Sequence, residues 1–122
     1  MNTHFHLFVY GSLRRNGSAA SHMAGAEWIG PATVGGILYD IDGAYTALVL
    51  YGATPVQGEV WKCPASMLSM LDEYEGVADS LFRRVGVEAV LEDGSSLGCW
   101  AYVAGPKLSR KLVPARRVDV SV

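Results

Sequence analysis

The chain has 122 residues, half of them hydrophobic and 18% charged, which is typical of one compact folded domain and excludes a disordered chain. The net charge of −2 excludes a general electrostatic attraction to nucleic acid or to anionic membranes. Because no apolar run approaches the length of a membrane span and the N-terminus lacks a signal-peptide pattern, we expect a cytoplasmic protein that does not enter a membrane.

The segment 4–10 has the composition of a first strand, with alternate residues on two faces. His4 and His6 share one face, but no further ligand is evident beside them, and a zinc site normally needs more than such a pair. Cys63 and Cys99 have no metal-binding spacing either. We therefore expect no metal site and two buried thiols in a reducing compartment, although the sequence leaves a disulfide between them open.

A polar turn over 11–17 follows this strand and has a glycine at each end. It lacks the G-x-S-x-G pattern around Ser12, because Tyr10 and Arg14 stand where the glycines would be, and it is too short for a nucleotide-binding fingerprint. Backbone N–H groups just past a strand can instead form a concave site for an anion such as a carboxylate. The alternative is an ordinary connecting loop, and the turn alone favours that alternative.

Residues 18–24 predict one or two helical turns, and 56–62 predict a strand. Between them, the segment 27–50 is rich in aromatic and branched apolar residues and predicts several short strands. The expected breaks between these strands are Gly30-Pro31, Gly35-Gly36 and Asp42-Gly43. Asp42-Gly43 is the best hairpin turn of the three.

A short helix that ends at Gly76 is the clearest helical pattern, and Pro64 suits its first turn. Its apolar stripe consists of Met67, Met70, Leu71 and Tyr74. Glu75 falls inside this arc, whereas Glu73 points outward and Asp72 sits at the margin. One carboxylate of the three is therefore expected to face the interior.

An inward carboxylate at a helix C-terminus is disfavoured as an anion by desolvation and by the helix dipole, and both effects raise its pKa. Glu75 would then have the property required of a general base near neutral pH. The alternative is a helix that frays early and leaves Glu75 solvated. Helical geometry alone leaves the two alternatives equally open.

Residues 81–91 and 97–103 predict a β-hairpin around the turn 92–94. Many short strands and one good helix, without regular β-α alternation, predict an α+β fold with a mixed, mostly antiparallel β-barrel flanked by short helices. We expect one domain over 1–104 and a basic C-terminal tail over 105–122 that packs on it or is partly disordered. The tail has no interleaved aromatic residues, so we expect no nucleic-acid partner.

Four motifs, taken in order, resemble the signatures of the gamma-glutamylcyclotransferase family. They are Phe8-Val9-Tyr10-Gly11-Ser12-Leu13, Gly58-Glu59-Val60, Leu71-Asp72-Glu73-Tyr74-Glu75 and Leu81-Phe82-Arg83-Arg84. Ala44-Tyr45 also lies where the family often has a Tyr-Pro step. The resemblance covers about residues 5–103, and the order and separation of the motifs make it specific.

The resemblance implies a barrel whose cavity holds a gamma-glutamyl group and in which Glu75 is the acid/base. The implied reaction is attack of the substrate's α-amino group on its own γ-carbonyl, which gives 5-oxoproline and releases an amine. The implied substrate-binding residues are Tyr10, Gly11, Ser12, Leu13, Tyr45 and Arg84. No metal, organic cofactor or enzyme nucleophile is required, and the expected partner is a small molecule with a gamma-glutamyl group.

The chain departs from the family pattern at Phe82, where tyrosine is common, and at Thr46, where proline is common. These departures concern the leaving-group side of the substrate, where family members diverge. The alternative function is a non-catalytic module that binds a small metabolite in the same cavity. Glu75 favours the enzyme, because a sensor of anionic ligands gains nothing from an inward anion. The sequence leaves open the amine that is released and the oligomeric state.

Overall fold

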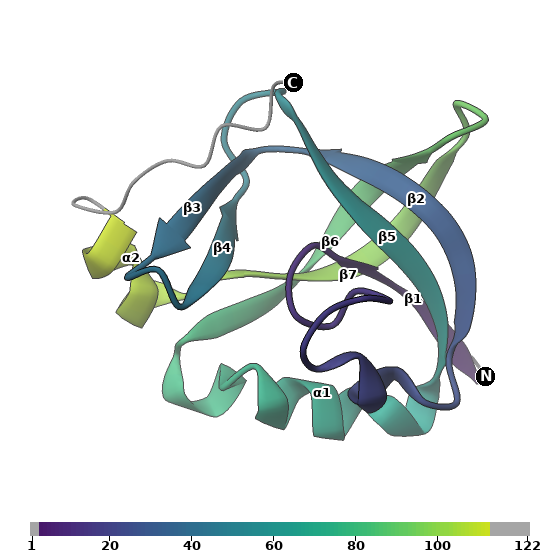
Figure 1. Cartoon of the computed structure of the whole chain (residues 1–122), viewed down its shortest axis with the longest axis horizontal. Helices are drawn as coiled ribbons and strands as arrows, with labels where there is room; N and C mark the ends of the chain where they lie inside the picture. The colour runs from purple at the N-terminus through teal and green to yellow at the C-terminus, as the bar shows by residue number, and fades with distance from the viewer. Residues whose placement is uncertain (1–2, 113–122) are drawn as a thin grey trace.

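The computed structural model describes residues 3–112 (Figure 1). The strands are β1 (His4–Val9), β2 (Glu27–Gly35), β3 (Ile37–Ile41), β4 (Tyr45–Val49), β5 (Pro55–Pro64), β6 (Phe82–Leu91) and β7 (Ser96–Ala104). The helices are α1 (Leu68–Tyr74) and α2 (Pro106–Leu112), with short 3-10 turns η1 (Ala20–Met23), η2 (Ala65–Met67) and η3 (Val77–Asp79). Neither helix has the length and apolar character needed to cross a bilayer.

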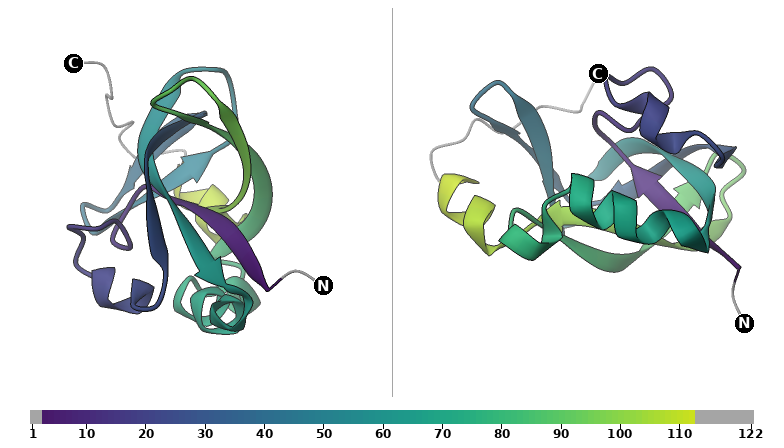
Figure 2. Two further views of the ribbon diagram at one scale, coloured as in Figure 1. Left: turned by 90° about the vertical axis from the view of Figure 1, so that its right-hand side faces the viewer. Right: turned by 90° about the horizontal axis from the view of Figure 1, so that it is seen from below.

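Five strands close a barrel in the order β1-β5-β2-β6-β7, which confirms the predicted mixed barrel with flanking helices. All neighbours are antiparallel except β1 and β7, which are parallel and pair only at Leu7 with Trp100 and at Phe8 with Ala101. Two views at right angles show α1 lying against one end of the barrel (Figure 2). The ends of β1 and β7 and the end of α1 therefore meet in one region of the molecule.

The core has two main parts, because both faces of β1 are buried in its second half. One part fills the barrel and includes Phe8, Val34, Val56 and Val60. The other lies between the barrel and α1, and it includes Leu7, Val9, Cys63, Met67 and Leu71. Helix α1 is too short to be stable alone, so this packing is what holds its C-terminal end in place.

The β3–β4 hairpin stands beside the barrel as a separate two-stranded sheet. Its turn is the predicted Asp42-Gly43, and both residues have positive φ, as a type I′ turn requires. Helix α2 packs against the hairpin through Leu108, which is fully buried. The first part of the expected C-terminal tail is thus folded onto the domain, whereas 113–122 lie outside the described residues.

Two local predictions around α1 are wrong. Pro64 ends β5 and precedes the 3-10 turn instead of sitting in the first helical turn. Met70 and Tyr74 are 37% and 41% exposed, so the buried stripe is reduced to Met67 and Leu71. Leu71 packs on the barrel, whereas Tyr74 at the C-terminal end of the helix lines a cavity.

The predicted break at Gly30-Pro31 is also wrong, since β2 continues through it. The register of β2 against β5 shifts between Trp28 and Gly30, and this bulge absorbs the irregular backbone of Gly30. Pro31 lacks an N–H, but β2 pairs with β6 only at Ala32 and Thr33. The proline therefore lies outside the stretch where β2 has neighbours on both sides.

Candidate active site

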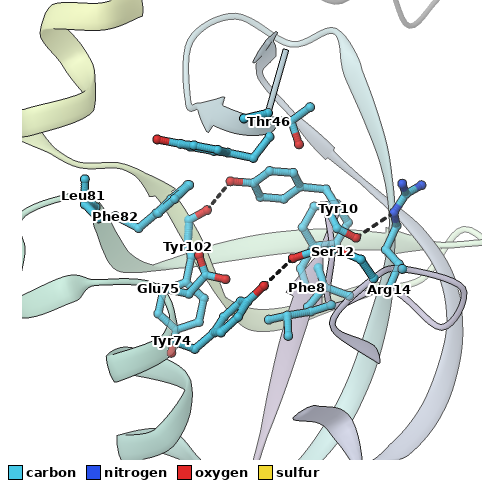
Figure 3. Close-up of a pocket in the computed structure, with 17 residues that line it drawn as sticks. Phe8, Tyr10, Ser12, Arg14, Thr46, Tyr74, Glu75, Leu81, Phe82 and Tyr102 are labelled. Carbon is cyan, nitrogen blue, oxygen red and sulfur yellow. Dashed lines mark hydrogen bonds between the residues drawn. The ribbon is translucent and has the colours of Figure 1, made fainter. Parts of the chain in front are cut away.

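A cavity of about 590 Å3 opens where the end of β1, the end of α1 and the start of β4 and β6 converge (Figure 3). Its lining residues are Phe8, Val9, Tyr10, Gly11, Ser12, Leu13, Arg14, Gly17, Ser18, Ala44, Tyr45, Thr46, Tyr74, Glu75, Leu81, Phe82 and Tyr102. Six of the seven residues expected at the site from the sequence are in this wall. Its size suits a small metabolite.

The turn after β1 forms one side of the cavity and is held in a fixed shape. The Ala19 N–H donates to the Ser12 carbonyl at 2.9 Å, and that carbonyl also occupies the space that a Cβ on Gly17 would need. The Arg15 N–H donates to Glu59 Oε1 at 2.7 Å. Glu59, from the Gly58-Glu59-Val60 motif, therefore supports the turn from behind without lining the cavity.

Three consecutive residues of this turn line the cavity. In the described part of the chain, no hydrogen bond uses the backbone N–H of Gly11, Ser12 or Leu13, and all three residues line the wall. A Cβ on Gly11 would lie in ordinary contact with Thr46 Oγ1, at 3.5 Å, so glycine leaves the space between the two residues free. Consecutive backbone donors of this kind can bind a carboxylate or the oxyanion of a tetrahedral intermediate.

Glu75 lies at the C-terminal end of α1 and faces the same cavity. Its N–H donates to the Leu71 carbonyl at 3.0 Å, and the following Gly76 has a φ of 67°, so the chain turns away immediately after it. Desolvation raises the pKa of Glu75 from 4.5 to about 7. The carboxyl can therefore exchange a proton close to neutral pH.

Two buried tyrosines border Glu75. The Tyr10 hydroxyl donates to the Tyr102 carbonyl at 2.6 Å and accepts from the Leu48 N–H at 3.0 Å, so it joins β1, β7 and the β3–β4 hairpin. Burial is the main cause that raises the pKa of both Tyr10 and Tyr102, whose side chains remain protonated; the charge of Glu75 adds to it at Tyr10, and the hydrogen bond to Asp72 adds to it at Tyr102. Both tyrosines are neutral parts of the wall at physiological pH.

Asp72 and Arg84 form an ion pair behind the cavity. Arg84 donates from Nε to Asp72 Oδ1 at 2.9 Å and from a terminal nitrogen to Oδ2 at 3.3 Å, while the Tyr102 hydroxyl donates to Oδ1 at 2.7 Å. Burial alone would raise the pKa of Asp72, but these hydrogen bonds and the guanidinium charge lower it below its usual value. The guanidinium also stacks 4.5 Å from the centre of the Trp100 ring.

The structure does not bring Arg84 to the cavity, although the sequence predicted it to be a substrate-binding residue. Its fork is occupied by Asp72, which the sequence placed at the helix margin with no role. The signal that was available is the spacing of Asp72 and Glu75, three residues apart on a helix, which puts both on the same side of α1. The structure brings Tyr10, Gly11, Ser12, Leu13, Tyr45 and Glu75 together as expected.

Tyr74 and Arg14 are two wall residues that sequence reasoning missed. The Tyr74 hydroxyl lies 2.8 Å from Ser12 Oγ, and its ring packs 4.5 Å from the ring of His22. The exposed helix end is therefore tied to the turn after β1. Arg14 donates from Nε to the Gly11 carbonyl at 3.1 Å and brings a positive charge to the wall.

The described residues contain no cluster of three or more histidine, cysteine, aspartate or glutamate side chains placed to hold a metal ion. The wall offers one titrating carboxyl, one guanidinium, backbone donors and neutral hydroxyls. Such a set can bind a carboxylate, stabilise an oxyanion and move a proton.

The family model described as gamma-glutamyl cyclotransferase, AIG2-like, matches residues 7–118. No curated protein matches the chain significantly. These two results rest on sequence alone and are independent of the site geometry.

Solved structures give the same picture of the fold. An AIG2-like protein from Mus musculus superposes with a TM-score of 0.77 at 22% identity, covering 99% of this chain and 90% of that one. A protein specific to uropathogenic E. coli has a TM-score of 0.76 at 20% identity, with coverage of 96% and 89%. A gamma-glutamyl cyclotransferase has a TM-score of 0.69 at 20% identity, with coverage of 93% and 69%.

Proposed function

The chain belongs to the gamma-glutamyl cyclotransferase, AIG2-like family, whose model spans residues 7–118, and from this premise we propose that it converts a gamma-glutamyl amine or amide to 5-oxoproline and a free amine. Glu75 is the general acid/base of this reaction. The observation that carries the proposal is the position of one carboxyl, with a pKa of about 7, in a cavity wall opposite unused backbone donors.

The proton transfers fit one such carboxyl. The α-amino nitrogen of the glutamyl group bonds to its own γ-carbonyl carbon and loses a proton to the Glu75 carboxylate. The bond from that carbon to the amine nitrogen then breaks, and Glu75 returns the proton to the leaving nitrogen. Both reacting groups belong to one molecule, so the ring closure is already intramolecular and needs no enzyme nucleophile, and the cavity has only to hold the two groups in a near-attack geometry.

The turn after β1 has two tasks in this proposal. Backbone N–H groups of Gly11, Ser12 and Leu13 receive the substrate carboxylate and the oxyanion that develops on the γ-carbonyl oxygen. Arg14 adds a positive charge on the same side of the cavity. Tyr10 contributes uncharged surface around the glutamyl chain, and Tyr45 contributes aromatic surface on the side of the leaving amine.

Release of 5-oxoproline from a panel of gamma-glutamyl amides tests the proposal. We expect Glu75→Gln to lower kcat by at least about a thousandfold, because the amide cannot accept the proton that the attacking α-amino nitrogen loses. Glu73→Gln is the matched control, since Glu73 is exposed on the same helical turn and does not line the cavity. The wild-type kcat should rise with pH through about 7, where Glu75 becomes a carboxylate.

Equal activity of wild type and Glu75→Gln would overturn the mechanism. Ligands that raise the melting temperature of the protein without any turnover across the panel would instead indicate a non-catalytic binding module.

A further inference from the structure

The wall of the cavity changes character from one end to the other. Arg14 and Ser12 lie at one end, on the turn after β1, whereas Leu81 and Phe82 lie at the opposite end (Figure 3). Glu75 lies between these two ends. In the proposed reaction, the reacting atoms therefore lie between a polar end of the cavity and an end lined by Leu81 and Phe82.

The second end is an apolar wall. The rings of Tyr45 and Phe82 pack in a tilted arrangement, with their centroids 6.1 Å apart, within the range usual for aromatic pairs, and their planes at 53°. Phe82 has no hydroxyl, and Leu81 and Ala44 add only aliphatic surface. Tyr45 is 41% exposed, so part of this surface is open to an incoming ligand.

This wall is held in place by hydrogen bonds and packing at Leu81. The Leu81 N–H donates to the Gly76 carbonyl at 3.2 Å, and the Leu81 carbonyl accepts from the Gly105 N–H at 2.8 Å. A Cβ on Gly76 would lie 2.8 Å from Leu81 Cδ1, so the side chain is seated against a glycine directly after Glu75. Little ordering is needed when a ligand packs on a surface that is fixed in this way.

Charge is confined to the rest of the cavity. Among the described residues that line it, Arg14 and Glu75 are the only charged side chains. In the proposed reaction Arg14 faces the glutamyl group and Glu75 works on the reacting atoms. A charged leaving group would consequently be desolvated against Tyr45, Leu81 and Phe82 without a partner, which is costly.

We propose that this wall, built by Tyr45, Leu81 and Phe82, selects gamma-glutamyl amides whose leaving amine carries an uncharged, apolar alkyl or arylalkyl group. The inference rests on the proposed cyclotransferase function and adds the class of amine that is released. The glutamyl group lies toward Arg14, the amide nitrogen lies beside Glu75, and the alkyl or aryl group packs on the wall.

Three substrates of nearly equal size separate the effect of charge from that of shape. They are the gamma-glutamyl amides of propylamine, of glycine and of ethylenediamine, the last with the gamma-glutamyl group on one nitrogen only. Near neutral pH their leaving groups end in a methyl, a carboxylate and an ammonium. We expect kcat/KM for the propylamide to exceed both others by at least about tenfold, because the wall offers no partner to either charge. The benzylamide should be at least as good as the propylamide, since its ring can pack with Phe82.

A matched pair of variants tests the wall itself. Tyr45→Asp places a carboxylate at the exposed edge of the wall and should raise the preference for the ammonium substrate over the propylamide by at least about tenfold. Tyr51→Asp is the control, because Tyr51 is 73% exposed on the loop after β4 and does not line the cavity. It should leave the preference unchanged.

The outcomes separate this inference from the function on which it rests. Turnover of the charged substrates at rates equal to or above that of the propylamide overturns the inference and leaves the cyclotransferase activity standing. The same holds if Tyr45→Asp remains folded by thermal unfolding and has the wild-type preference. No 5-oxoproline from any of the four amides overturns both.

Discussion

The proposed proton transfers depend on one ionisable group, the carboxyl of Glu75. Its carboxyl is withdrawn from water at the end of α1, and no cation is recorded against it among the described residues. The folded state therefore holds the proton on Glu75 more tightly than the unfolded chain does. Ionisation of Glu75 therefore lowers the free energy of unfolding, and the pH dependence of this loss can be measured.

We expect Glu75→Gln to stabilise the protein at pH 8 but not at pH 4. The pKa is about 7 in the folded state and 4.5 in the unfolded chain, so wild-type stability falls as pH rises between these values. The full difference is on the order of 3 kcal/mol. Urea unfolding of both proteins at the two pH values measures it.

Glu73→Gln removes the same charge from an exposed position on the same helical turn and serves as the control. If the stability of Glu75→Gln relative to wild type does not change between pH 4 and pH 8, then Glu75 is not desolvated in solution.

The sequence predicted that Glu75 faces the cavity, but it did not predict which side chains surround Glu75. Helical periodicity placed Glu75 inside the apolar arc but left a solvated position equally open, and the family resemblance favoured the inward one. The roles of Asp72, Arg84 and Tyr102 depend on how α1 sits against β6 and β7, and no local pattern contains that information. The sequence therefore predicted that Arg84 binds substrate, whereas in the structure its guanidinium group is paired with Asp72.

Among the elements, α1 is attached to the barrel by a group of hydrogen bonds around Asp72, close to the cavity. Asp72 accepts hydrogen bonds from Arg84 of β6 and from the Tyr102 hydroxyl of β7. The backbone carbonyl of Tyr102 accepts a further hydrogen bond from the hydroxyl of Tyr10, directly after β1. The ion pair is about three-quarters buried, with the two side chains 24% and 28% exposed. Partial burial makes such a pair more valuable than one on the open surface.

A double-mutant cycle with Asp72→Asn and Arg84→Gln measures this attachment. We expect each single variant to lose about 1–3 kcal/mol of unfolding free energy and the coupling to be about 1 kcal/mol or more, because either change leaves a half-buried partner unsatisfied. Arg83→Gln, at the exposed neighbouring position on β6, is the control. Zero coupling would show that the contact adds nothing to the docking of α1.

Element boundaries were predicted best where turn chemistry is decisive. Asp42-Gly43 produced the expected hairpin because its positive φ angles match the twist of the paired strands. Gly30-Pro31 did not end a strand, because a bulge and a one-sided neighbour accommodate both residues. A glycine-proline pair therefore does not end a strand when a bulge and the pairing of the neighbouring strands can accommodate it.

For the whole molecule, the two cysteines provide a simple test of the packing. Cys63 lies in the core between the barrel and α1, Cys99 lies in the barrel core, and both are free thiols. Burial raises the pKa of each thiol to about 11, so neither is ionised at neutral pH.

We expect a thiol reagent to label neither cysteine rapidly in the native protein and to label both in denaturant without prior reduction. The measured quantity is the number of thiols per chain, with and without denaturant. A count of zero in denaturant would indicate a disulfide that the structure does not have. Rapid labelling of the native chain would contradict the burial of the thiols.

The fold class followed from the pattern of many short strands and one good helix, and the family model and solved neighbours confirm it. The order β1-β5-β2-β6-β7 was not predictable in the same way. Strand order is decided by which apolar faces are buried together, and several orders satisfy the same alternating pattern. The position of the cavity depends on that order.

The parallel junction between β1 and β7 has a consequence for biosynthesis. Leu7 and Phe8 must wait for Trp100 and Ala101 before the barrel can close, so the ribosome has to translate most of the message first. Until then, the nascent chain exposes an open edge of β1 and has no partner for the Tyr10 hydroxyl on Tyr102. The cavity is therefore completed only late in synthesis, after the last barrel strand has been translated.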